Sequence, residues 1–184
     1  NGSAGYGTII TSKDVTWAAN GFDYKTANYS LYSYDAATDE LVPVTSTAVA
    51  ISGEPGYLIY IRGSRSVTPS ASVSSVDATT LRTSGTLYTG DQPASNVDAD
   101  RFGMIGNPYA SAIDLRNVAT SGGCAGTSFY VWDPKLLGSY NVGGIQTLTP
   151  SGGNYIVIPG GGSYGSSGSI VNTIESGAAF LVQA

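Results

Sequence analysis

Short runs of apolar and aromatic residues recur along the chain, and each run is bounded by glycine, proline, asparagine or aspartate. Runs of this kind are typical of β-strands. They lie at residues 29–35 (YSLYSYD), 56–63 (GYLIYIRG), 86–90 (TLYTG), 127–133 (TSFYVWD), 154–161 (NYIVIPGG) and 178–184 (AAFLVQA). In the first run tyrosine alternates with smaller residues, which predicts a half-buried strand. Long segments with a helical period are absent, and one short helical turn is expected at residues 109–118.

The 25 glycines and 8 prolines recur between these runs, which favours antiparallel sheets over an α/β layer. We therefore predict an all-β fold, with a β-sandwich or jelly-roll-like arrangement of antiparallel sheets and long Gly/Ser loops. Two such loops are residues 68–80 and 159–169. The second is so rich in glycine that ordering it costs much backbone entropy. We expect it to be mobile or to be held by a neighbouring segment.

Residues 1–184 are predicted to form one β-rich domain, and an internal echo suggests two pseudo-repeated halves with a boundary near 90–100. An aromatic run that ends in aspartate is followed, in each half, by a Glu-x-Gly turn and an apolar run. The paired stretches are 29–35 with 54–62, and 127–133 with 175–183. The alternative to a duplication is chance, because strands that end in aspartate and turns that contain glycine are common.

Composition narrows the classes of partner. Apolar residues make up 41% of the chain, which is enough for a core, but charged residues make up only 11% and the net charge is −5. The 8 basic residues are scattered, so the basic stripe that nucleic acid requires is missing. No segment approaches the ~20 apolar residues of a membrane-spanning helix. A surface with so few charges is unusual for a free cytosolic monomer, and chains that associate with their own copies or lie in an extracellular layer can tolerate it.

The residue types present also restrict the chemistry. The chain has no histidine, which excludes a Ser-His-Asp or Cys-His triad and a histidine zinc site. Cys124 is the single cysteine, so no internal disulfide forms. Asp114, Asp133 and Glu175 could form a carboxylate pair, but aspartate at a strand end is usually a turn former. We therefore predict that the protein is not an enzyme and has no catalytic residues.

No cofactor is expected, with calcium as the one candidate. Two loops place carboxylates at short intervals, although neither has the spacing of an EF-hand. The candidate ligands are Asp98, Asp100, Asp35 and Asp39. The alternative interpretation, turn aspartates without metal, is favoured.

An apolar run ends abruptly at Gly106-Asn107-Pro108-Tyr109. Proline restricts its own φ and the conformation of the preceding residue, and the Asn107 amide can bond to nearby backbone groups. A structural corner explains every residue, and the alternative is a corner in which Asn107 and Tyr109 contact a sugar. Three further tyrosines lie among glycines and are expected to be exposed at an interface or ligand site: Tyr6, Tyr140 and Tyr164.

Tyr130 and Trp132 share one face of their predicted strand. A place in the core is favoured over an exposed platform for sugars or proteins. The residues expected to pack the core are Ile59, Ile61, Met104, Ile105, Trp132, Ile156, Phe180 and Val182.

Five motifs resemble, in the same order, a group of large surface and secreted proteins of Bacteroidetes that are commonly exported by the type IX secretion system. The motifs are GYLIYIRGSRS (56–66), TTLRTSGTLYTGD (79–91), GMIGNPYASAIDL (103–115), FYVWDPKL (129–136) and IESGAAFLVQA (174–184). The resemblance runs from about Tyr29 to the C-terminus and implies an extracellular, cell-surface β-rich module without catalytic residues. The chain departs from the glutamine of the family's GQAFFV pattern, because alanines stand at Ala178–Ala179.

The predicted function is a non-enzymatic extracellular structural or adhesive surface protein that self-assembles into a fibre or layer. The expected partner is the protein itself, as a homo-oligomer or fibre, because either terminal run could add to the sheet edge of the next copy. The alternative is a carbohydrate-binding module that accompanies a secreted hydrolase, with surface glycans as partners. An exposed aromatic row would favour the alternative.

Overall fold

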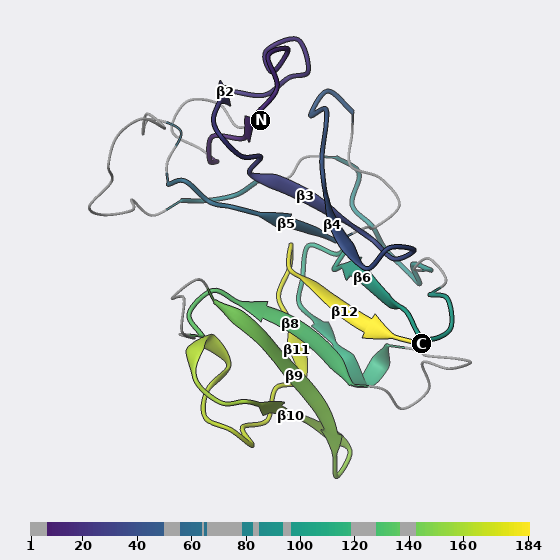
Figure 1. Ribbon diagram of the computed structural model, residues 1–184. Coiled ribbons are helices and arrows are strands. Elements are labelled where there is room, and N and C mark those ends of the chain that lie inside the picture. The colour runs from purple at the N-terminus through teal and green to yellow at the C-terminus, as the bar shows by residue number, and fades with distance from the viewer. Residues whose placement is uncertain are drawn as a thin grey trace. The chain divides into compact units, whose positions relative to one another are not determined.

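The computed structural model describes residues 7–49, 56–63, 65, 79–82, 85–93, 97–118, 128–136 and 143–184. This part of the chain consists of strands, turns and two short 3₁₀ helices, which confirms the predicted all-β fold (Figure 1). The strands are β1 (Thr11–Ser12), β2 (Tyr24–Lys25), β3 (Leu31–Asp35), β4 (Glu40–Pro43), β5 (Tyr57–Ile59), β6 (Phe102–Gly106), β7 (Ile113–Asp114), β8 (Phe129–Asp133), β9 (Gly144–Ser151), β10 (Asn154–Ile158), β11 (Thr173–Ile174) and β12 (Ala179–Gln183). The 3₁₀ helices are η1 (Leu115–Asn117) and η3 (Gly162–Tyr164).

The chain divides into two compact units. The first contains residues 1–33, 41–52 and 57–86, and the second contains residues 34–40, 53–56 and 87–184.

The first unit has a parallel pair, β1 and β2, and the three-stranded order β4-β3-β5. Phe22 and Tyr29 are buried, and their rings meet edge to face with centroids 6.2 Å apart. Asp23 accepts a hydrogen bond from the backbone N–H of Ile10 at 2.9 Å and forms an ion pair with Arg65. Aromatic packing and a half-buried ion pair thus hold this unit's loops.

The second unit is built on an antiparallel sheet of order β10-β9-β8-β12-β6. In Figure 1 the C-terminal strand β12, in yellow, lies between β8 and β6. The register pairs Phe180 with Ile105 and Leu181 with both Met104 and Tyr130. Because β12 is internal, it is not an unpaired strand that could join another copy, and the prediction for this terminus is wrong.

One face of this sheet carries the core. Alternate side chains of β8, Phe129 and Val131, are 1% exposed, and Leu148 of β9 and Val157 of β10 are fully buried. Phe129 and Phe180 meet edge to face with centroids 5.3 Å apart. Burying such side chains contributes roughly 1.5–3 kcal/mol each. This face is therefore the main hydrophobic contribution to the unit's stability.

A second, smaller layer covers that core. β7 and β11 pair antiparallel, and Ile174 of β11 and Leu115 of η1 belong to the same buried cluster. Asp114 ends β7 and accepts the N–H of Arg116 at 2.9 Å, which begins η1. The predicted helical turn at residues 109–118 is confirmed, in a short 3₁₀ form.

Two strand predictions need correction. Residues 86–90 are not a strand: Leu87 is 71% exposed and Tyr88 is 43% exposed, so the run packs against little. The longest strand, β9, was not predicted, because Gln146 stands where an apolar inward residue is expected. That glutamine is fully buried beside the glycine-rich loop.

The echoed segments form neighbouring antiparallel strands in both halves. β3 lies between β4 and β5, and β8 lies between β9 and β12, so the local strand order is the same. The registers of the two strand pairs differ. Tyr32 pairs with Leu58, and in the second half the equivalent residues are Tyr130 and Ala179. Tyr130 instead pairs with Leu181, two residues beyond Ala179. The duplication stays a prediction.

Candidate functional site

The second unit's large sheet has an outer face, opposite its core. It is defined by the residues that alternate with the buried ones on β8, β9 and β10: Tyr130, Trp132, Ile145, Thr147, Thr149, Ile156 and Ile158. None of these residues is charged. The exposed fractions are 42% for Trp132, 42% for Ile145 and 44% for Ile158. Large apolar side chains therefore remain in contact with solvent on three adjacent strands.

Cross-strand pairing makes this face continuous. Trp132 lies opposite Ile145, and Thr147 lies opposite both Tyr130 and Ile158. The Tyr130 ring packs edge to face against the Phe102 ring, with centroids 5.3 Å apart. Neighbouring side chains of this kind support one another on a pleated surface.

The prediction that Trp132 packs the core is wrong. Both alternating sets on β8 contain apolar residues, and the set that faces inward is the one with Phe129 and Val131. Ile61 was also expected in the core and is 42% exposed. Phe180 and Val182 are buried as predicted, and Ile105 packs against the core.

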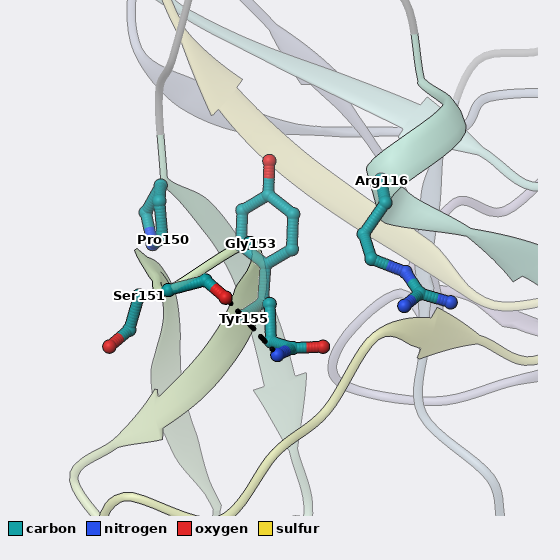
Figure 2. Close-up of a pocket in the computed structure, with 7 residues that line it drawn as sticks. Arg116, Pro150, Ser151, Gly153 and Tyr155 are labelled. Carbon is teal, nitrogen blue, oxygen red and sulfur yellow. Dashed lines mark hydrogen bonds between the residues drawn. The ribbon is translucent and has the colours of Figure 1, made fainter.

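A hollow of about 340 Å³ opens where the β9–β10 turn approaches η1 (Figure 2). It is lined by Arg116, Pro150, Ser151, Gly152, Gly153, Asn154 and Tyr155. Figure 2 shows the Tyr155 ring standing between Pro150 and Arg116. This volume lies near the lower end of the range for small-ligand sites, about 300–1,000 Å³.

Two consecutive hydrogen bonds through asparagine side chains hold the strand residues at the hollow. The backbone N–H of Tyr155 donates to Asn172 Oδ1 at 2.9 Å, and Asn172 Nδ2 donates to Asn154 Oδ1 at 2.9 Å. The Tyr155 ring packs on Phe129 with centroids 5.2 Å apart, and burial raises the pKa of its hydroxyl. The adjoining turn has φ of 57° at Gly152 and 79° at Gly153, which a two-residue turn between these strands favours.

The cation at the hollow is already paired. Arg116 Nε donates to Asp114 Oδ1 at 3.0 Å and Arg116 Nη2 donates to Asp114 Oδ2 at 2.6 Å. Hydrogen bonds from the Arg116 side chain and backbone lower the pKa of Asp114 to about 2. The pair is therefore ionised and close to neutral overall at physiological pH.

Two buried polar side chains hold the glycine-rich loop at residues 159–169. Asp133 is fully buried and accepts the N–H of Lys135 at 2.8 Å and both the N–H and the hydroxyl of Ser163. Gln146 Nε2 donates to the carbonyls of Pro159 at 2.8 Å and Gly161 at 3.0 Å. Burial alone would raise the pKa of Asp133, but these donors hold it below its usual value. The loop is thus held by neighbours, one of the two predicted outcomes.

The corner at residues 106–109 is held by its own chain. Asn107 is buried, and its Nδ2 donates to the carbonyls of Ser111 at 2.9 Å, Ile174 at 3.2 Å and Glu175 at 3.1 Å. Its Oδ1 accepts the N–H of Tyr109 at 3.0 Å, and the Tyr109 hydroxyl donates to a backbone carbonyl. The expected bonding of the amide to backbone is confirmed, and the sugar-binding interpretation of the corner stays a prediction.

The candidate calcium ligands do not gather into one site. Asp35 Oδ1 accepts the N–H of Ala37 at 2.9 Å, and Asp39 accepts the hydroxyl of Tyr34. Asp98 and Asp100 are exposed. Within the described ranges no group of three or more acidic or cysteine side chains is arranged to hold a metal ion. These four aspartates stay predictions as ligands.

The remaining tyrosine candidates fall in different places. Tyr6 and Tyr140, like Cys124, lie outside the described residues. Tyr164 was expected to be exposed, but it is half-buried and packs against the core cluster, and burial raises its pKa. It lines a second hollow of about 360 Å³ together with Glu175.

Comparison with known proteins gives no relative: no protein-family model, no curated protein and no solved structure matches the chain. Across the part of the chain that the structure describes, helices of the length and apolar character required to cross a membrane are not found.

Proposed function

We propose that this chain is a non-enzymatic structural and adhesive module of an extracellular surface, and that it associates with further copies of itself through the outer face. The observation that carries the proposal is the exposure of Trp132, Ile145 and Ile158 on three adjacent strands. Covering such side chains releases water from apolar surface, which drives association.

A second copy fits this face better than a charged partner. The outer face has no charged side chain to pair with a polyanion, a polycation or a charged membrane. Two like faces can meet without bringing charges together, although each chain has a net charge of −5. Sheets pack face to face in proteins at about 10 Å, so an uncharged β face can pack on the same face of a second copy.

Association through faces also agrees with the state of the sheet edges. Along β10, Val157 donates its N–H to Ser169 at 3.0 Å and accepts one from Gly168 at 3.0 Å. At β6, Gly56 donates its N–H to Met104 at 3.1 Å. Both edges therefore already use backbone groups within the unit, which disfavours strand addition as the main contact.

The extracellular location rests on the charge-poor composition and on the sequence resemblance. The non-enzymatic character is supported by the fate of the candidate carboxylates. Asp114 is tied to Arg116, and Asp133 is fully buried with its oxygens occupied by donors. Asp133 therefore has no access to a substrate, and the Asp114 carboxylate, although it is partly exposed, is engaged by Arg116. Glu175, the third candidate, is exposed.

Sedimentation velocity over a concentration series tests the proposal. The wild-type chain is expected to form larger species as concentration rises. The double variant Trp132→Thr with Ile145→Thr is expected to stay monomeric. The control Val15→Thr with Leu41→Thr changes side chains that are 81% and 45% exposed outside the face, and should associate like wild type. A monomeric wild-type chain at high concentration, or equal association by all three proteins, would refute the proposal.

A further inference from the structure

The hollow between the β9–β10 turn and η1 offers hydrogen-bonding groups that the chain itself leaves unused. Among the described residues, the hydroxyls of Ser151 and Tyr155 and the Nη1 group of Arg116 have no partner. Asn154 Nδ2 has only a long contact, 3.5 Å, to the carbonyl of Gly152, drawn as the dashed line in Figure 2. The Tyr155 hydroxyl, the Arg116 guanidinium and the Asn154 amide thus line one small volume, whereas Figure 2 shows the Ser151 hydroxyl pointing away from the Tyr155 ring.

The hollow's electrostatics favour an uncharged ligand. Asp114 offsets the charge of Arg116 through side-chain hydrogen bonds, and among the described residues no other charged side chain lines the hollow. An anion would have to compete with Asp114 for the guanidinium, and a cation would meet the guanidinium itself. A neutral ligand with several hydroxyls avoids both costs, and its hydroxyls can donate to and accept from these groups.

The shape of the hollow favours a ring. Tyr155 presents an aromatic ring whose position is fixed by its packing on Phe129. At Gly152 and Gly153 a Cβ would meet no atom of the described residues within 4 Å, so that part of the chain leaves the turn open to a ligand. The apolar C–H face of a sugar can lie on such a ring while its hydroxyls reach the polar groups around it.

We propose that this hollow binds a neutral saccharide unit, with the Tyr155 ring as its platform and Arg116 and Asn154 as its hydrogen-bonding partners. Tyr155 alternates with the outer-face residues of β10, and Arg116 belongs to η1, so neither is part of the outer face. Saccharide binding would thus be a second adhesive activity, separate from self-association.

Native affinity electrophoresis in gels that contain soluble polysaccharides tests this site. The uncharged probes are a mannan, a galactan and a glucan, and dextran sulfate is the anionic probe. The wild-type chain is expected to be retarded by at least one uncharged polysaccharide and not by dextran sulfate. Calorimetry with oligosaccharides of the retarding polymer then gives the dissociation constant for each variant.

Arg116→Gln should weaken binding about 10- to 100-fold, because it removes a charged hydrogen-bond donor. Tyr155→Phe keeps the ring and its packing, and should weaken binding about 3- to 10-fold through loss of the hydroxyl. Arg101→Gln is the matched control: Arg101 is exposed, does not line the hollow, and should bind like wild type. Thermal melting checks that each variant is folded.

Four results would overturn the site: no retardation by any uncharged probe, stronger retardation by dextran sulfate, unchanged affinity of folded Arg116→Gln, or equal loss in Arg101→Gln. Loss of binding with Trp132→Thr but not with Arg116→Gln would place the saccharide on the outer face instead. Self-association measured by sedimentation is expected to be unaffected by Arg116→Gln, so the two proposals can fail separately.

Discussion

Trp132 and Ile145 lie opposite each other on neighbouring antiparallel strands, and each residue is 42% exposed to solvent. The residues next to them along the strands, Val131 and Gln146, also lie opposite each other, and both are almost completely buried. The same pair of strands therefore has a packed face and a solvent-facing face that both bear large side chains. Both faces of the sheet bear apolar side chains, but among the described residues only one face is covered by other parts of the unit. This difference is the basis of the proposed self-association.

Asn107→Ala should lower the free energy of unfolding by about 1–3 kcal/mol. The change removes one acceptor and three donor contacts and leaves the carbonyls of Ile174 and Glu175 without this partner. Urea denaturation measures the effect. The control is Asn117→Ala, an exposed position, which should change stability by less than about 0.5 kcal/mol. Equal effects at the two positions would show that the corner's hydrogen bonds do not matter.

Asp133→Asn should destabilise the second unit by about 1.5–3 kcal/mol at neutral pH, because an amide nitrogen would face the N–H of Ser163. The pKa of Asp133 is lowered in the folded chain. Its stabilising contribution is therefore complete above the unfolded pKa of about 3.9 and is lost as pH falls through the folded value.

The difference between wild type and Asp133→Asn should consequently shrink in urea titrations repeated below about pH 3. Asp98→Asn, at an exposed position, is the control and should show little difference at either pH. A difference for Asp133→Asn that is the same at both pH values would contradict an ionised Asp133 in the folded chain.

Gly160→Ala should be poorly tolerated, with a loss of at least about 2 kcal/mol. A Cβ at this position would lie 1.8 Å from the backbone nitrogen of Ser167 and 2.5 Å from the carbonyl carbon of Ser166, and backbone cannot easily move away. Gly144→Ala is the control, because its nearest neighbour is the flexible end of Leu136 at 3.0 Å. Thermal melting that ranks Gly144→Ala as the more damaging change would contradict the close packing of the loop.

Removal of calcium should leave the melting temperature within about 2 °C of its starting value. Asp35 and Asp39 already accept hydrogen bonds from Ala37 and Tyr34, so they can act as turn residues without a metal. Melting curves with chelator, and with calcium restored, measure the change. A large fall that calcium reverses would return the candidate aspartates to the account as ligands.

Strands β3, β5, β8, β10 and β12 were predictable because local composition defines them, but the side that faces the core was not. On β8 a period of two separates Phe129 and Val131 from Tyr130 and Trp132, and both sets are apolar. Only the covering layer of β7, η1 and β11 decides which set is buried. β9 escaped prediction because Gln146 is buried for its bonds to the loop and not for its hydrophobicity.

The hollow could not be predicted from the sequence, because its residues meet only through long-range pairing. Arg116 follows β7, which pairs with β11, whereas Tyr155 belongs to β10. The hydrogen bond between Arg116 and Asp114, two residues earlier, could have been suspected from the sequence. An aspartate before a short turn often accepts a hydrogen bond from the backbone of that turn. The Asp114 and Asp133 turns show that this expectation was correct at the local level.

Trp132 itself can report most directly on the central claim. The chain has two tryptophans, so Trp17→Phe leaves Trp132 as the only indole. Its emission maximum and its quenching by acrylamide are measured across the concentration range in which sedimentation shows association. Burial of the outer face between copies predicts a blue shift and weaker quenching as association proceeds. Emission and quenching that stay constant while the chain associates would contradict the account, because another surface would then form the contact.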